Sequence, residues 1–343
     1  MQQKNIAKVG LVGLGRFGMV HAENIARNVP GVRLQAACSH HRSSLERVRE
    51  ELSVDETFLD YEEMVKRADI DAIVISSVVG EHLKQVKLAF QAGKHVFVEK
   101  PMASTVEECR DMLLLRHNYP KLILMVGFMR RYDPSYAYAK QKILNGEIGE
   151  PYLVKCVSLD AVRFVDELLR VIPGSGGLFP SLGIHDIDLM AWFLDSKPAY
   201  VSAFGGSYGY PQFEKMGDVE AGCAIFKFKN GTLGMLHNGR TAAHGFHIET
   251  EIVGTKGSIR IGPIPAKNQA MLYKNDGVVI ECNDDYRIRY IQAYRNEIKE
   301  FGDCIIEKRH PQITIEDGID ATIASVAAKQ ALEEGRVIVI DYR

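Results

Sequence analysis

The chain has 343 residues, of which 46% are hydrophobic and 25% are charged. At roughly 150 residues per domain, this length predicts about two domains. The composition is that of a packed globular protein and excludes a disordered or fibrous chain. Lys and Arg number 42 against 44 Asp and Glu, a formal charge of −2. This balance lacks the broad positive field that nucleic acids or anionic membranes attract, so we expect a small-molecule partner.

Membrane, disulfide and metal classes are also disfavoured. No unbroken apolar run reaches the roughly 18 residues that a membrane-spanning helix needs, and the six cysteines are scattered without a C-x-x-C pair. A metal site of His237, His244 and His247 is unfavourable, because residues three apart on a strand face opposite sides and no Cys or carboxylate lies at ligand spacing. We therefore expect a cytoplasmic protein with no metal.

The first 126 residues alternate between short β-branched apolar runs and longer amphipathic stretches. Strands are expected at residues 8–12, 33–38, 72–76, 95–98 and 122–126. Helices are expected at residues 17–28, 43–51, 81–92 and 106–119. Strands that alternate with helices run parallel with right-handed crossovers, so residues 1–127 are predicted to form an α/β domain with a doubly wound Rossmann sheet.

From about residue 152 onward the polarity alternates with a period of two, and turns such as Asn230-Gly231 join the segments. Strands are expected at residues 151–159, 199–204, 223–229, 232–237, 247–253 and 257–261. Helices are expected at residues 184–193, 288–307 and 316–335. Residues 128–343 are thus predicted to form an α+β domain with a large, mostly antiparallel sheet. Its uncovered face predicts a homo-oligomer, a dimer or a tetramer.

The stretch Gly13-Leu14-Gly15-Arg16-Phe17-Gly18 matches G-x-G-x-x-G between the first strand and the first helix. In this pattern Gly13 makes the tight turn, Gly15 lets a pyrophosphate approach the backbone, and Gly18 lets helix and strand pack closely. The helix N-terminus adds free N–H groups and partial positive charge. The motif therefore predicts a dinucleotide site.

The end of the second strand leaves the choice of dinucleotide open. An NAD-binding chain usually carries Asp or Glu there to bind the adenosine ribose, whereas this chain has Ser39, His40, His41 and Arg42. Ser39 can hydrogen-bond the ribose of NAD. No carboxylate repels a 2′-phosphate and Arg42 can attract one, so NADP is the alternative.

Five stretches together resemble the glucose-fructose oxidoreductase/inositol dehydrogenase (Gfo/Idh/MocA) family, nearly from end to end. They are residues 71–77, His82, residues 92–103, residues 127–134, and Gly176-Gly177 with residues 185–188. Their most specific element is Glu99-Lys100-Pro101, directly after the strand at residues 95–98. The resemblance implies an NAD-dependent dehydrogenase of a cyclic polyol or sugar, above all of myo- or scyllo-inositol.

Lys100 and His185 are the expected catalytic residues. Lys100 lies at the carboxyl end of a parallel strand, where its ammonium group can donate to a substrate oxygen. His185 follows a Gly-rich segment, and an imidazole can take the hydroxyl proton as hydride leaves. One departure stands out: the family's inositol dehydrogenases usually have Asp four residues before the His, where this chain has Ser181. Either Asp188, one turn after His185, partly supplies the missing negative charge, or the substrate is held differently from that in relatives with the Asp. A structural role for Asp188 is equally open.

The resemblance also implies the remaining site residues. Arg130 and Asp160 are expected on the substrate side, although either could instead form an interdomain ion pair. The full substrate set is Lys100, Arg130, Asp160, Ser181, His185 and His244. The expected cofactor set is Gly13, Gly15, Arg16, Phe17, Gly18, Ser39, Arg42, Ser76, Ser77, His82, Glu99 and Lys100.

Three other functions remain open. An NADPH-preferring reductase of a keto-inositol or sugar differs from the favoured dehydrogenase only in cofactor and direction. A glycoside hydrolase that uses NAD for transient oxidation would share the fold. A dinucleotide-sensing regulatory protein would need neither Lys100 nor His185.

Overall fold

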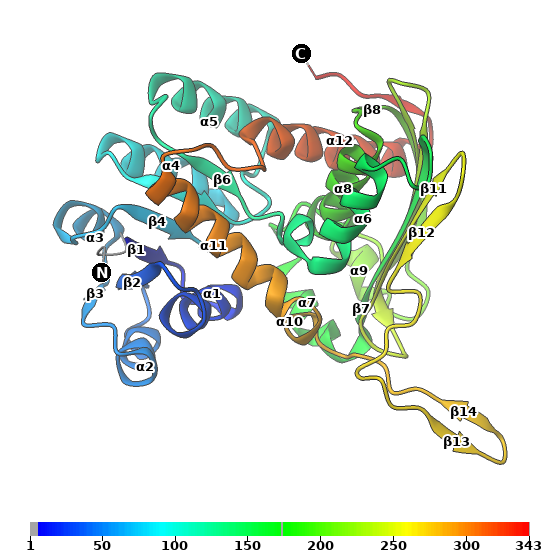
Figure 1. Cartoon of the computed structure of the whole chain (residues 1–343), viewed down its shortest axis with the longest axis horizontal. Coiled ribbons are helices and arrows are strands. Elements are labelled where there is room, and N and C mark those ends of the chain that lie inside the picture. Colours follow the sequence, from blue (N-terminus) through cyan, green and yellow to red (C-terminus); the bar gives the residue numbers. More distant parts are fainter. Residues whose placement is uncertain (1–5, 173, 343) are drawn as a thin grey trace. The chain divides into compact units, whose positions relative to one another are not determined.

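The computed structural model describes residues 6–172 and 174–342, and the chain divides into two compact units (Figure 1). The first comprises residues up to Asp133 together with Ile291–Ile319. The second comprises Pro134–Tyr290 and the residues from Asp320 onward. This division differs from the single boundary predicted at residue 127, because the chain returns to the first unit after residue 290.

The first unit is built on a six-stranded parallel sheet, as the alternating pattern predicts. Its strand order is β3-β2-β1-β4-β5-β6, the order of a doubly wound dinucleotide-binding fold. The strands are β1 (Ala7–Val12), β2 (Val32–Cys38), β3 (Glu56–Phe58), β4 (Ala72–Ile75), β5 (His95–Val98) and β6 (Leu124–Val126). The sequence prediction missed β3, because three half-buried residues give no apolar run.

Helices cover both faces of this sheet. They are α1 (Arg16–Arg27), α2 (Arg42–Leu52), α3 (Tyr61–Arg67), α4 (His82–Gln91), α5 (Val106–Asn118) and α11 (Ile291–Glu307), with the short helices η1 (Val79–Glu81) and η2 (Met129–Tyr132). Although α11 is far away in sequence, it packs against α1, β1 and β2. Ile298, Phe301 and Cys304 of α11 are fully buried in the core that these elements share. Each such large apolar side chain contributes about 1.5–3 kcal/mol by leaving water.

A seven-stranded sheet forms the second unit, in the order β12-β11-β7-β10-β9-β8-β15. Its strands are β7 (Pro151–Ala161), β8 (Pro198–Gly206), β9 (Ala221–Phe228), β10 (Leu233–Ala242), β11 (His247–Gly254), β12 (Ser258–Ile261) and β15 (Ile338–Val339). Only β7 and β10 pair in parallel among these strands, which confirms the predicted mostly antiparallel sheet. A separate hairpin, β13 (Leu272–Lys274) and β14 (Gly277–Val279), projects from this unit (Figure 1).

The helices of the second unit lie mainly on one face of its sheet (Figure 1). They are α6 (Pro134–Leu144), η3 (Val162–Phe164), α7 (Val165–Val171), the π-helical turn η4 (Phe179–Gly183), α8 (Ile184–Leu194), α9 (Gln212–Lys215), α10 (Tyr286–Arg289) and α12 (Ile315–Glu334), whose first residues belong to the first unit. The single helix predicted at 288–307 is divided into α10 and α11. Tyr290 leaves the helical conformation there, and its buried ring packs edge-on against Phe246.

The two faces of the seven-stranded sheet differ in exposure. Alternate residues such as Val201, Ala224 and Phe226 are buried, whereas the intervening side chains point outward and are partly apolar and partly polar. The exposed apolar side chains of this outer face include Tyr200, Phe204, Ile225, Leu233, Met235 and Val339. Among the described helices, none is long and apolar enough to cross a membrane.

Candidate functional site

The glycine motif adopts the geometry that its spacing predicts. Gly13 has a φ of +89°, and a Cβ there would stand 2.5 Å from the carbonyl oxygen of Ser76. A Cβ on Gly18 would stand 1.7 Å from the carbonyl oxygen of Gly13. At Gly15, in contrast, a Cβ would meet nothing within 4 Å. Gly13 and Gly18 are therefore required by the fold, whereas Gly15 leaves open space above the backbone.

This open space lies at the N-terminus of α1, which begins at Arg16 and has no side-chain cap. First-turn N–H groups of a helix are free to bind an anion, so the turn fits a pyrophosphate. Arg16 is half-buried, and the ring of Phe17 packs edge-on against Tyr294 of α11 with centroids 6.2 Å apart. Phe17 therefore shapes the wall of the turn.

Ser39 follows β2 directly, and its hydroxyl oxygen accepts the N–H of His41 at 3.2 Å. Arg42 begins α2 and is exposed. With Arg49 and Arg67 it lines a cavity of about 360 Å³ between α2, β3 and α3. The Ser39 hydroxyl group is therefore available to hydrogen-bond a ribose. The exposed guanidinium group of Arg42 is available to bind a phosphate.

The buried His82 side chain connects the loop after β4 to the loop after β5. The Ser77 hydroxyl donates to Gln85 at 2.7 Å. The His82 ring nitrogens lie 3.2 Å from the carbonyl oxygens of Ser77 and Pro101, and the residue is 2% exposed. Burial lowers its pKa, against the effect of these carbonyl groups. His82 was expected to contact the cofactor, but its ring nitrogens instead join two loops of the site.

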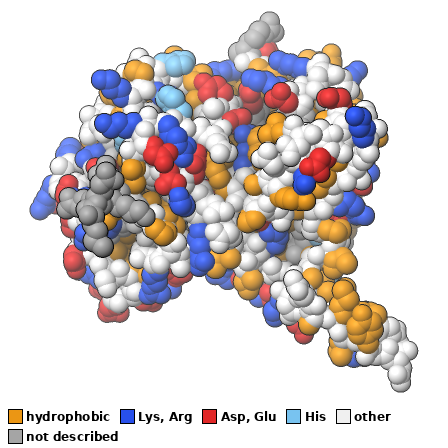
Figure 2. Space-filling model, viewed as in Figure 1, with side chains coloured by type: hydrophobic (Ala, Val, Ile, Leu, Met, Phe, Trp, Pro, Cys, Tyr) orange, Lys and Arg blue, Asp and Glu red, His pale blue; other side chains and the backbone are white. Residues whose placement is uncertain are grey.

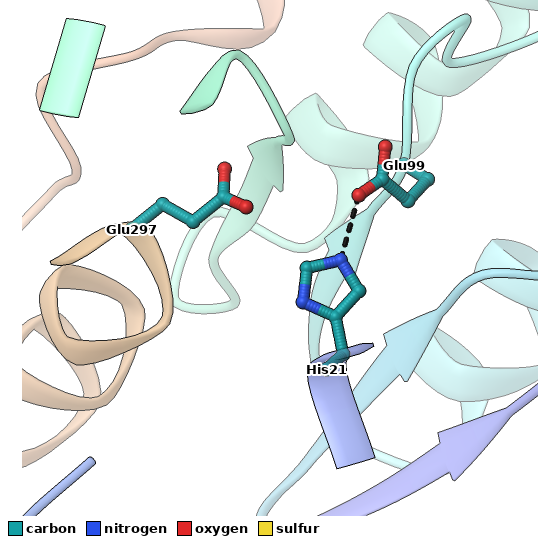
Figure 3. A group of neighbouring side chains, drawn as sticks. All are labelled: His21, Glu99 and Glu297. Carbon is teal, nitrogen blue, oxygen red and sulfur yellow. Dashed lines mark hydrogen bonds and ion pairs between the residues drawn. The ribbon is translucent and has the colours of Figure 1, made fainter. Parts of the chain in front are cut away.

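Glu99 and Lys100 follow β5 at the carboxyl edge of the sheet. Glu99 was also expected to contact the cofactor, but its carboxylate faces inward. One oxygen lies 2.6 Å from Nε2 of His21 and the other accepts the backbone N–H of Lys100 at 3.1 Å. Glu297 of α11 points toward this pair (Figure 3). Sequence reasoning missed His21 and Glu297, because nothing but the packing of α11 on α1 brings them together.

His185 lies in the first turn of α8 and is 5% exposed. The turn η4 precedes it directly and contains Ser181. Gly176 and Gly177 approach this turn with φ values of +83° and +100°, a conformation that strongly favours glycine. The Gly-rich segment is therefore a sharp entry into the helix that carries His185.

Ser181 is held by protein groups. Its hydroxyl donates to the carbonyl oxygen of Gly177 at 2.6 Å and accepts from Arg240 at 3.0 Å. Arg240 also pairs with Asp218 at 3.0 Å, and both side chains are buried. The expectation that Ser181 simply replaces an Asp as a hydrogen-bonding group for substrate is thus incomplete. The Arg240 guanidinium group, which Asp218 neutralises, lies beside Ser181.

A buried polar cluster anchors α8 to the sheet. Asp186 is fully buried and accepts from Ser158 of β7 at 2.8 Å and from Asn238 of β10 at 3.1 Å. A Cβ on Gly183 would stand 2.5 Å from the Asn238 side-chain oxygen. Sequence analysis considered Asp188, which is also buried, and overlooked Asp186. The position of Asp186 directly after His185 was the signal in the sequence that could have indicated its role.

The other expected substrate residues lie in different surroundings. Arg130 belongs to η2 of the first unit and is 2% exposed, although it was predicted to lie in the substrate domain. Asp160 is half-buried near the end of β7, and His244 is exposed between β10 and β11. The Nε2 of His244 lies 3.1 Å from Nδ1 of His247. Their predicted contacts with substrate remain predictions.

Within residues 6–172 and 174–342, one group has side chains close enough to hold a metal ion. It consists of His21, Glu99 and Glu297, whose ligand atoms lie within 4.8 Å of one another. His237, His244 and His247, which the sequence analysis considered, do not form such a group in the described chain. The expectation of no metal remains a prediction.

Comparison with known families matches both units. A model of an oxidoreductase family with an NAD-binding Rossmann fold, Gfo/Idh/MocA, matches residues 7–128. The model of the Gfo/Idh/MocA C-terminal domain matches residues 136–260. The chain belongs to the Gfo/Idh/MocA family. Both the resemblance read from Glu99-Lys100-Pro101 and the expected fold are thereby confirmed.

Members of this family with assigned activities are similar to the chain over almost its whole length. The scyllo-inositol 2-dehydrogenase (NAD(+)) of Bacillus subtilis is 32% identical over 98% of this chain and 97% of that protein. A crystal structure of scyllo-inositol dehydrogenase from Lactobacillus casei with bound NAD(H) and scyllo-inositol is 38% identical, with a TM-score of 0.95 over 98% of this chain and 99% of that one. The myo-inositol 2-dehydrogenase structure from Lactobacillus plantarum is 33% identical, covers 98% of this chain and 100% of that one, and also has a TM-score of 0.95.

Proposed function

We propose that the protein is an NAD-dependent dehydrogenase of inositol, acting on a secondary alcohol of scyllo- or myo-inositol. The observation that carries the proposal is that Lys100 follows β5 in the same sheet in which Gly13–Gly18 follow β1. Both lie at the carboxyl edge of a doubly wound sheet, where such folds bind their ligands. The similarity to inositol dehydrogenases along the whole chain supports the same substrate class.

The first unit provides the cofactor site in this proposal. The turn from Gly13 to Gly18 holds the pyrophosphate through the N-terminus of α1, and Ser39 binds the adenosine ribose. The loop of Ser76 and Ser77 lines the opposite side. Bound NAD supplies the acceptor for the hydride that leaves the substrate carbon.

Two side chains handle the reacting hydroxyl group. The Lys100 ammonium group donates a hydrogen bond to its oxygen and stabilises the negative charge that develops there. A ring nitrogen of His185 accepts the hydroxyl proton during oxidation and returns it during reduction. We assign substrate contacts also to Arg130, Asp160 and His244, and an indirect role to Ser181. Hydrogen-bonding side chains suit a neutral polyol. Acidic and basic side chains are also interspersed on the face drawn in Figure 2, so the described residues of this face form no broad patch of one charge that would attract a charged substrate.

An assay of NAD reduction with a panel of inositols and sugars tests the proposal. The wild-type protein should reduce NAD with scyllo- or myo-inositol. Replacement of Lys100 by Met or His185 by Asn should lower kcat by about 10²–10⁴-fold, the usual contribution of an acid–base group. The exposed Lys87→Met on α4 is the control and should leave kcat unchanged. No turnover of any polyol with either cofactor would refute the proposal.

An NADPH-preferring reductase is the second candidate, and one observation favours it. Ser39 occupies the position of the usual carboxylate, and the exposed Arg42 lies three residues further on. Arg42→Ala should then raise the KM for NADPH about 10-fold or more and leave that for NAD unchanged, since a charged hydrogen bond contributes about 1.5–3 kcal/mol. Equal KM values before and after the change would eliminate this role.

The proposal includes a homo-oligomer in the cytoplasm. The outer face of the seven-stranded sheet carries large apolar side chains, including Phe204 at 71% and Ile225 at 54% exposure, which a second copy would cover. Figure 2 also shows hydrophobic side chains gathered on the β13–β14 hairpin. A reducing compartment agrees with the six free cysteines.

A further inference from the structure

Three polar side chains from distant parts of the sequence meet in the interior of the first unit, directly behind Lys100. His21 comes from α1, Glu99 follows β5, and Glu297 comes from α11 (Figure 3). His21 and Glu297 are fully buried, and Glu99 is 8% exposed. One ligand atom from each residue lies within 4.8 Å of those from the other two.

The hydrogen bonds of this cluster are incomplete if both carboxyl groups are ionised. Nε2 of His21 pairs with Glu99, but Nδ1 of His21 and both oxygens of Glu297 have no partner within the described chain. An ionised Glu297 would be a buried carboxylate without a hydrogen-bond donor beside the carboxylate of Glu99, which is costly. Burial, and then the charge of Glu99, raise the pKa of Glu297 well above its usual value. A proton on Glu297 removes one charge and supplies the donor that Nδ1 lacks.

The surroundings restrict where such a proton can reside. Phe97 and Tyr294 pack edge-on against the His21 ring, with centroids 5.4 and 6.1 Å away. Besides His21 and Glu99, the phenol of Tyr132 from η2 is a titratable group near Glu297, and Glu300 of α11 acts on the same phenol. Burial, and then these carboxyl groups, raise the pKa of Tyr132.

Glu300 is already neutralised by another partner. Its carboxylate pairs with Arg309 at 2.7 Å, and its pKa is lowered first by that hydrogen bond. Glu300 therefore stays ionised and does not take up the proton. Glu297 is therefore the carboxyl group that we expect to carry the proton.

Glu99 connects this cluster to the catalytic strand end. One carboxylate oxygen accepts from His21 and the other accepts the backbone N–H of Lys100 at 3.1 Å. Its own backbone N–H donates to Ile75 of β4 at 2.9 Å. A fixed Glu99 side chain therefore fixes the backbone from which the Lys100 side chain extends.

We propose that Glu297, His21 and Glu99 form a buried carboxyl–imidazole–carboxylate chain that holds a proton on Glu297 and positions Lys100. The Nε2–H of His21 donates to Glu99, which also accepts the Lys100 N–H. The remaining link is the inferred one: Glu297 and Nδ1 make no hydrogen bond in the described structure, and a protonated Glu297 turns to donate to Nδ1. His21 and Glu297 are positioning residues that do not touch substrate. The consequence for catalysis rests on the proposed function of Lys100, whereas the proton chain itself does not.

A bound divalent cation is the competing way to neutralise the two carboxylates. The 2.6 Å separation of His21 Nε2 and Glu99 Oε1 is that of a direct hydrogen bond. Two ligands of one zinc ion, each at about 2.1 Å from it, stand roughly 3 Å or more apart. The geometry therefore favours the proton, and metal analysis of the purified protein decides between them.

Two measurements test the chain without any substrate. Infrared difference spectra of wild type minus Glu297→Gln should show the carbonyl band of a protonated carboxyl group. Because the folded state keeps a proton that the unfolded chain releases above about pH 4.3, wild type should lose thermal stability relative to Glu297→Gln as the pH rises above that value. Glu300→Gln, on the same helix, is the control and should leave the band in place.

Kinetics test the positioning of Lys100. Glu297→Gln keeps a donor for Nδ1, so kcat should stay within about threefold of wild type. Glu297→Met has none, and kcat should fall about 10–100-fold, as for other small misplacements of a catalytic group. The Kd for NAD should stay within about threefold for both variants, as a positioning role requires.

The contrary outcomes are distinct. A missing carboxyl band, a pH-independent stability difference, or a stoichiometric metal ion that Glu297→Gln loses would overturn the proton chain. Equal kcat values for Glu297→Met and wild type would overturn the positioning role. A wild type that oxidises no polyol would refute the proposed function of the protein, while the infrared and stability measurements would still decide the proton chain.

Discussion

At the scale of single residues, the glycines of the motif meet two different requirements, one of the fold and one of the bound cofactor. Gly13 and Gly18 are fixed by the protein itself, since a Cβ at either position would overlap backbone atoms. Gly15 has open space around its Cα, so only a bound ligand would require glycine there. Stability and cofactor affinity should therefore respond differently to the same substitution.

We expect Gly18→Ala to lower the thermal unfolding midpoint, because α1 must move away from the β1 turn. Gly15→Ala should leave this midpoint within about 2 °C, since surface changes usually alter stability by less than about 0.5 kcal/mol. Its Kd for NAD should still rise about 10-fold or more. Thermal unfolding and fluorescence titration with NAD measure the two effects. Unchanged NAD binding by Gly15→Ala would place the pyrophosphate elsewhere.

At the scale of elements, polar contacts fix both the first turn of α8, which carries His185, and the turn η4 that precedes it. Asp186 attaches its first turn to β7 and β10. The Arg240–Asp218 pair holds the preceding turn η4 through Ser181, and Asp218 also accepts the N–H of Leu178 at 2.8 Å. The pair thus fixes the turn that contains Ser181.

Arg240→Met should leave the Asp218 charge buried without compensation and cost about 3–5 kcal/mol of stability. It should also lower kcat, because η4 would no longer hold α8 in place. The double variant Arg240→Met/Asp218→Asn should lose less than the two single variants combined.

The control is Lys197→Met, which removes a partly exposed ion pair with Asp320 in the same unit. It should cost less than about 1 kcal/mol. Thermal unfolding and steady-state kinetics of all four variants provide the comparison. Additive losses in the double variant would show that Arg240 and Asp218 act independently.

At the scale of the whole molecule, the seven-stranded sheet has one covered face and one open face. Ile225 of β9 lies opposite Met235 of β10, so large apolar side chains adjoin across these two strands, while Ser202 and Lys227 are polar positions of the same face. Such a surface is typical of a contact between copies of a chain. The expected assembly is therefore a property of the second unit.

Ile225→Lys should dissociate the assembly, because it places a charge in the middle of this surface. Sedimentation velocity should show an oligomer for wild type and a monomer for the variant. Leu114→Lys on α5 replaces an equally exposed apolar residue of the first unit and should leave the assembly intact. A monomeric wild type, or an Ile225→Lys variant that still assembles, would contradict an interface on this sheet face.

Local patterns in the sequence determined much of the protein. The alternation of strands and helices predicted the doubly wound sheet, the period-two polarity predicted the mostly antiparallel sheet, and Glu99-Lys100-Pro101 indicated the family. These features could be predicted because strand and helix periodicity, turn geometry and the glycine motif depend on residues that are close together in sequence.

Only the tertiary structure decided the features that depend on distant segments. It placed α11 with the first unit, brought Glu297 beside His21 and Glu99, and set Arg240 against Ser181. Burial of the apolar face of α11 drives the first two arrangements, and pairing of β9 and β10 beneath η4 positions the third. Amphipathicity shows that a helix has an apolar face but not which surface covers it. For that reason the sequence indicated Lys100, while packing revealed the side chains that hold its backbone in place.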